Sequence, residues 1–75
     1  MRKYTIILEP EPEDGGYVVL VPALPGCITQ GETVSECIER AQEAITGYIE
    51  SLRQAGEPIP DEPERPQAIT IEVHV

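Results

Sequence analysis

Two short apolar stretches near the start of the chain are separated by a turn sequence. Residues 4–8 (YTIIL) and 17–21 (YVVLV) are rich in β-branched and aromatic side chains, which favour strands. The acidic, proline-containing stretch between them ends in Asp14, Gly15 and Gly16, and glycine supplies the positive φ of a tight turn at no steric cost. The two stretches are therefore predicted to pair as an antiparallel hairpin.

A second turn and a third strand follow the hairpin. The turn contains Pro22, Ala23, Leu24, Pro25 and Gly26. Residues 27–30 then predict a short strand, which Gly31 ends. The first half of the chain is therefore predicted to be a three-stranded antiparallel meander.

The next segment has the period of an amphipathic helix. Thr33 and Glu36 have the spacing of a capping box, in which the Thr33 hydroxyl accepts from the Glu36 amide and the Glu36 carboxylate accepts from the Thr33 amide. Apolar residues in steps of three and four define one helical face: Val34, Cys37, Ile38, Ala41, Ala44, Ile45, Tyr48, Ile49 and Leu52. The opposite face carries Glu36, Glu39, Arg40, Glu43 and Glu50. Glu36 and Arg40 are spaced for an ion pair, and Gly56 is a natural C-terminal cap.

The last part of the chain predicts an extended connector and a fourth strand. Residues 57–67, here called the connector, contain four prolines and four acids, and proline excludes a helix there. Residues 68–75, here called the tail, place Ile69, Ile71, Val73 and Val75 on one side in strict alternation. The predicted order is β-β-β-α-β, an α+β fold of one domain over residues 1–75, with one helix on one face of a small sheet. The other sheet face, with side chains such as Ile7, Val18 and Leu20, is too apolar for water, so we expect either a homo-oligomer, a dimer or a tetramer, or a partner that covers this face.

Charge narrows the class of partner. The chain has 14 acids against 5 Lys and Arg, a formal net charge of -9. Such a field repels nucleic-acid phosphates and anionic membranes and favours a basic partner, although the same charge is also explained by solubility alone. No apolar run is long enough to cross a bilayer, the start of the chain is not a signal peptide, and the two cysteines are too few for a disulfide framework or a zinc site. We expect a cytoplasmic protein with free thiols.

No set of side chains predicts catalysis or a cofactor. His74, the only histidine, is near the end of the tail without a nucleophile or an orienting group beside it in the sequence. Cys37 belongs to the apolar helix face, Ser35 to the first helical turn, and Cys27 is interpreted either as structural or as a reactive thiol. Acids cluster at residues 9–14 and 61–64, where they are either metal ligands or solvated charge, but their spacing matches no metal site. We therefore predict neither a catalytic residue, nor a metal, nor a cofactor.

The order of these motifs resembles the HicB family of antitoxins. The resemblance extends over residues 4–60 and is carried by DGGY (14–17), VPALPGC (21–27), TQGET (29–33), the helix with Glu36 and Ala41, and GEPIP (56–60). It implies a partial RNase H-like fold and a function: HicB-type proteins bind and neutralise HicA-type toxins, which are small basic ribonucleases that cleave mRNA. The alternative is a solitary oligomeric module without a toxin, which binds a small ligand between subunits.

The resemblance also bears on individual residues. Eight residues that match the motifs are interpreted as structural: Gly15, Gly16, Pro22, Leu24, Pro25, Gly26, Gly31 and Thr33. Electrostatics, not the resemblance, makes Glu36, Glu39 and Glu43 the candidate partner-binding residues. Many members carry a C-terminal DNA-binding domain, and this chain stops at Val75, so we do not expect direct DNA binding. A nuclease is not expected either, because the centre of the first strand is Ile6 and Ile7 instead of acids.

Overall fold

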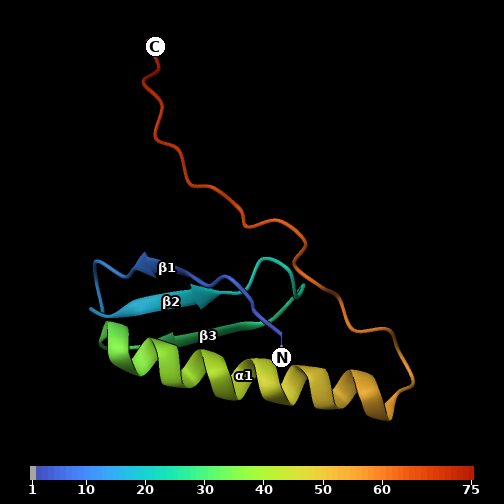
Figure 1. Cartoon of the computed structure of the whole chain (residues 1–75). Coiled ribbons are helices and arrows are strands. Elements are labelled where there is room, and N and C mark those ends of the chain that lie inside the picture. The colour runs from blue at the N-terminus through green and yellow to red at the C-terminus, as the bar shows by residue number, and fades with distance from the viewer. Residues whose placement is uncertain (1) are drawn as a thin grey trace.

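The computed structural model describes residues 2–75 and contains three strands followed by one helix (Figure 1). β1 (Ile7–Pro10), β2 (Tyr17–Leu20) and β3 (Ile28–Gly31) form an antiparallel sheet in the order β1-β2-β3, and α1 (Val34–Gln54) packs mainly against β3 and less against β2. The α+β class, the meander and the single covering helix are confirmed. β1 begins three residues later than the first apolar stretch of the sequence.

The register of the sheet divides its side chains between two faces. Val19 pairs with Leu8 and Thr29 and is fully buried against Cys37 and Ala41, so this row lies on the helix side. The next row pairs Ile7 with Leu20 and Leu20 with Ile28. Because successive residues of a strand alternate between faces, this apolar row lies on the side away from α1, where Ile28 is 60% exposed. The prediction that one apolar sheet face lacks a cover is therefore correct for residues 2–75.

The core is small and consists of two adjoining clusters. Its buried apolar residues are Val19, Cys37 and Ala41 in one cluster and Val21, Leu24 and Cys27 in the other. Ile6 packs against both clusters and joins them. Val34 and Ile38, predicted to face the core, remain about half exposed because the three strands do not cover the whole apolar side of the helix. A short chain buries a limited share of its surface, and much apolar area stays in contact with water.

Both ends of α1 are capped locally. The Thr33 hydroxyl accepts from the Glu36 amide at 3.1 Å, while the Glu36 carboxylate accepts from the Glu32 amide at 2.9 Å, one residue earlier than the predicted Thr33 amide. At the other end Gly56 has a φ of 69°, and its amide donates to the Arg53 carbonyl while the Glu57 amide donates to the Leu52 carbonyl. This pattern is the Schellman motif, which needs a left-handed residue such as glycine after the helix.

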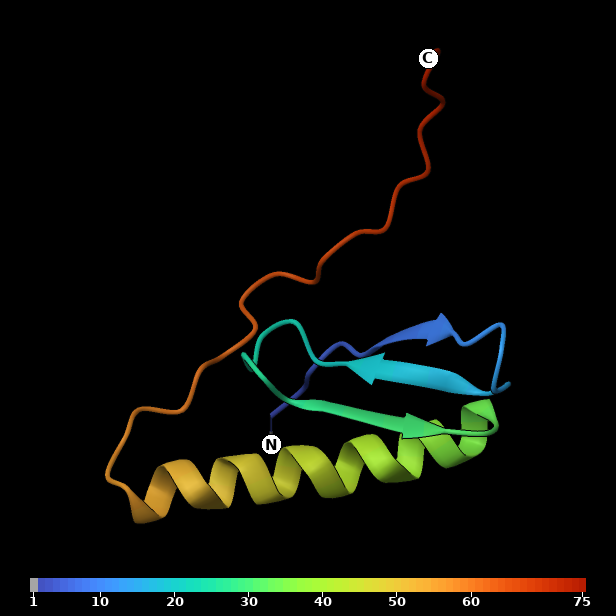
Figure 2. The ribbon, with the colours of Figure 1, turned by 180° about the vertical axis from the view of Figure 1, so that it is seen from behind.

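The fourth strand predicted over the tail is not formed. Residues 68–75 have no regular secondary structure, and the tail leads away from the sheet in both views (Figures 1 and 2). The alternating pattern is real, but a strand exists only where another strand pairs with it, and no described residue of the same chain does so. The β-β-β-α-β order is therefore corrected to β-β-β-α with an extended tail.

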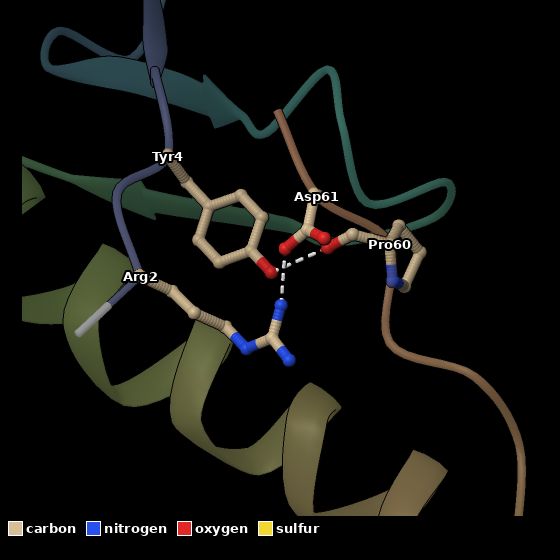
Figure 3. Close-up of polar contacts among 4 residues, drawn as sticks. All are labelled: Arg2, Tyr4, Pro60 and Asp61. Carbon is tan, nitrogen blue, oxygen red and sulfur yellow. Dashed lines mark hydrogen bonds and ion pairs between the residues drawn. The ribbon is translucent and has the colours of Figure 1, made fainter. Parts of the chain in front are cut away.

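The connector is nevertheless fixed to the body beside the start of β1. The Tyr4 hydroxyl donates to the Pro60 carbonyl at 2.6 Å, and Arg2 forms an ion pair with Asp61 (Figure 3). Thr5 donates twice to the Glu62 carboxylate, from its amide at 2.7 Å and from its hydroxyl at 2.6 Å. These contacts determine where the tail leaves the body.

Candidate partner-binding surface

An acidic cleft lies where the β1–β2 turn, the end of β3 and the start of α1 meet. It has a volume of about 440 Å³. Its charged lining residues are Glu11, Asp14, Glu32, Glu36 and Arg40. Tyr17, Gln30 and the backbone at Gly15 and Gly31 complete it. Four carboxylates against one guanidinium make the cleft an acceptor for lysine or arginine side chains.

The turn that forms one wall of the cleft depends on close backbone contact. The Glu11 amide donates to the Gly16 carbonyl at 3.0 Å, and the Gly15 amide donates to the Glu11 carbonyl at 2.9 Å. A Cβ at Gly16 would lie 2.6 Å from the Gly31 carbonyl oxygen and 3.1 Å from the Glu32 Cα, which is too close for any side chain. Gly16 thus allows the turn to approach Glu32, and this approach brings the acids of the two segments together.

The three predicted partner-binding glutamates lie along the same side of α1 but differ in burial and in their neighbours. Glu36 lines the cleft, is half-buried and is engaged by the Glu32 amide. Glu39 and Glu43 are exposed and line a neighbouring shallow groove with Arg40 and Gln42. The ion pair predicted between Glu36 and Arg40 is absent from the part of the chain that the structure describes. Glu36 accepts from a backbone amide instead. Arg40 lines both the cleft and the groove.

The proline-containing motif after β2 builds a compact corner of the fold. The Val21 amide donates to the Cys27 carbonyl, the Leu24 amide to the Val21 carbonyl and the Cys27 amide to the Leu24 carbonyl. Leu24 at the centre is fully buried, whereas Pro22, Pro25 and Gly26 are exposed. The Tyr48 hydroxyl donates to the Pro25 carbonyl at 2.8 Å and ties this corner to the helix. These residues lie away from the acidic cleft.

The remaining candidate residues are two cysteines, Ser35 and His74. Burial raises the pKa of the Cys27 thiol, which favours the unreactive protonated form and agrees with the structural interpretation of this cysteine. Cys37 is fully buried against Val19, while Ser35 and His74 are exposed. Within residues 2–75 no three His, Cys, Asp or Glu side chains come close enough together to hold a metal ion. None of the described helices is long and apolar enough to span a membrane.

Of the cleft carboxylates, only Glu36 was among the residues selected from the sequence, and the other three were missed. Glu11 and Asp14 lie in the turn before β2, and Glu32 directly precedes the helix cap. Their proximity follows from the pairing of Tyr17 with Gly31, which aligns the turn with the start of α1. A register between β2 and β3 derived from the alternating apolar positions would have indicated this proximity.

Comparisons with other proteins bear on these features. A family profile described as the HicB-like antitoxin of bacterial toxin–antitoxin systems matches residues 4–72. A UPF0150 protein of Thermoplasma acidophilum is 53% identical over 72 residues, which make up 96% of this chain and 97% of that protein. A UPF0150 protein of Synechocystis is 49% identical over 59 residues, 79% of this chain and 73% of that protein. The antitoxin HicB of Escherichia coli is 40% identical over 58 residues, which are 77% of this chain but 41% of HicB.

Proposed function

Because this chain belongs to the HicB-like antitoxin family of bacterial toxin–antitoxin systems, we propose that it binds and neutralises a small basic HicA-type toxin that cleaves mRNA. This proposal rests on the membership of the chain in that family. The neutralisation acts through protein–protein contact and requires no reaction by the antitoxin itself.

Charge complementarity supports a basic partner. The chain carries a net charge of -9, and the cleft and the adjoining groove together present exposed carboxylates along one side of α1. Opposite potentials on two surfaces accelerate their encounter and fix their relative orientation. Lysine and arginine side chains of a toxin would enter the cleft beside Glu32 and lie along Glu39 and Glu43.

The exposed glutamates are the residues to change in a test. Glu39→Lys and Glu43→Lys remove carboxylates that make no hydrogen bond or ion pair in residues 2–75, so the fold should be kept. Glu36 is unsuitable because its carboxylate caps the helix. Glu50→Lys is the control on the same helix, roughly 10 Å further along by the rise of 1.5 Å per residue. Because it also breaks the exposed ion pair of Glu50 with Arg53, its free energy of unfolding is measured together with its affinity.

The experiment is co-purification of the chain with any small basic protein that the neighbouring reading frame encodes, followed by a ribonuclease assay of the complex. We expect the complex to form and the ribonuclease activity to disappear. The double variant Glu39→Lys/Glu43→Lys should bind about tenfold or more weakly, about 1.4 kcal/mol, with a smaller loss at high salt, while Glu50→Lys binds nearly normally.

Several outcomes would contradict the proposal. If the chain binds no basic neighbour and leaves ribonuclease activity intact, the toxin-binding function is wrong and the solitary oligomeric module takes its place. If binding is retained but the double variant and Glu50→Lys bind alike, the partner contacts another surface. The purified chain should also leave RNA intact with magnesium or manganese present, and cleavage would show an enzyme instead.

A further inference from the structure

The tail has the sequence of a strand but lacks a partner. Ile69 and Ile71 are each 74% exposed and Val73 is 67% exposed, although their alternation with Thr70 and Glu72 is that of a half-buried strand. A soluble chain rarely leaves several large apolar side chains of one strand in water. The tail therefore has the composition of a segment that is covered in the functional state.

The sheet offers a matching free edge at β1. β1 pairs with β2 on one side, and no described residue pairs with its other side. An unpaired strand edge presents backbone donors and acceptors to any extended segment. Each face of the sheet has one apolar side chain at this edge: Ile7 on the face away from α1 and Leu8 on the face toward α1. An added strand can therefore place its apolar side against an apolar neighbour on whichever face it points to.

The path of the connector directs the tail away from its own sheet. Tyr4 and Thr5 hold the connector at Pro60 and Glu62, beside the start of β1. Pro63 and Pro66 follow directly, and neither can donate to a sheet ladder, so pairing can begin only beyond them. Beyond that point the tail projects outward from the body (Figures 1 and 2).

We propose that the tail pairs with the free β1 edge of a second copy of this chain, in a reciprocal exchange that makes a twofold dimer. Each copy then has a four-stranded sheet completed by the strand of its partner. The exchange pairs both the tail and the β1 edge of each copy. The two contacts are identical because a twofold axis relates the copies.

The charge distribution favours this contact despite the acidity of the chain. Within the tail only Glu72 and His74 are ionisable, and both alternate with the apolar side chains on the other face of the strand. The carboxylates of the cleft lie at the β1–β2 turn and the start of α1, and β1 itself carries one carboxylate, Glu9, on the same face as Ile7. The dimer contact and the proposed toxin contact therefore use different surfaces, and the dimer does not depend on the toxin.

The test uses the full chain alone, by light scattering after size exclusion and by hydrogen exchange. We expect about twice the chain mass of 8.2 kDa, with slow exchange at the amides of residues 69–75 and of β1. Ile71→Lys should weaken the dimer at least tenfold and release both segments to fast exchange. Thr70→Lys, with the same added charge on the polar face, should leave the dimer intact.

Three results would overturn the exchange. A monomer with a protected tail would mean that the tail folds back on its own β1. A dimer with an unprotected tail, or one that loses no affinity in Ile71→Lys, would mean that the copies associate elsewhere. Residue 71 lies outside the core clusters, so slow exchange at the amides of α1 and β2 in Ile71→Lys separates loss of the dimer from loss of the fold.

Discussion

Gly16→Ala provides the sharpest test of how the acidic cleft is built, with Gly15→Ala as its control. The two glycines are adjacent and have nearly the same backbone angle, with φ of 74° at Gly15 and 73° at Gly16. A Cβ at Gly15 would meet no atom within 4 Å, whereas one at Gly16 would lie 2.6 Å from the Gly31 carbonyl oxygen. The pair therefore separates the cost of the backbone angle from the cost of close contact.

The magnitudes follow from these two terms. A left-handed angle costs a non-glycine residue about 1–2 kcal/mol, and this cost applies to both variants. The loss of glycine's freedom in the unfolded chain is also common to both and cancels in their difference. Overpacking adds about 1–3 kcal/mol at Gly16 alone. We expect Gly15→Ala to lower the free energy of unfolding by about 1 kcal/mol and Gly16→Ala by about 2–4 kcal/mol.

The assay is urea denaturation followed by far-UV circular dichroism at one protein concentration, which keeps any contribution from dimerisation constant. Gly16→Ala should also weaken the proposed toxin contact, because relief of the clash moves the turn away from Glu32. Equal losses of stability in the two variants would refute the reasoning, since they would mean that the turn gives way to the methyl group without cost.

Two further predictions concern α1 and the connector. Gly47 lies inside the helix with no atom within 4 Å of an added Cβ, so Gly47→Ala should raise the free energy of unfolding by about 1 kcal/mol in the same assay, and a loss would reveal a contact at this site. The Thr5 hydroxyl and amide lower the pKa of Glu62 below its ordinary 4.5, so their stabilising contribution is full above that value and disappears as the pH falls through the lowered pKa. Thr5→Val should move the pKa of Glu62 back upward in a carboxyl NMR titration, and an unchanged pKa would contradict the hydrogen bond.

The elements that follow local rules could be predicted from the sequence. α1 was predicted correctly because its period, the Thr33 cap and Gly56 all act within one or two turns of the helix. β2 was predicted almost residue by residue because turn glycines precede it and Pro22 follows it. The start of β1 was placed too early, since Tyr4 and Thr5 use their side chains to hold the connector, and no local pattern indicates a contact across 56 positions.

The cleft and the tail depended on partners that a sequence does not display. Glu39 and Glu43 were identified because helical spacing places them on one side. Glu11 and Asp14 were missed because only the strand register brings them opposite Glu36. The tail shows the converse: its alternation has the pattern of a strand, but the strand predicted there was wrong, because alternation does not supply an edge to pair with.

The connector contacts have a consequence for the order of folding. The meander and the helix are joined by short turns, so their contacts close small loops and can form while the chain is still being synthesised. The bond from Tyr4 to Pro60 closes a loop of 56 positions and must wait until the helix has left the ribosome. The connector should therefore dock last onto a finished body, and it can detach and dock again without unfolding the sheet and the helix.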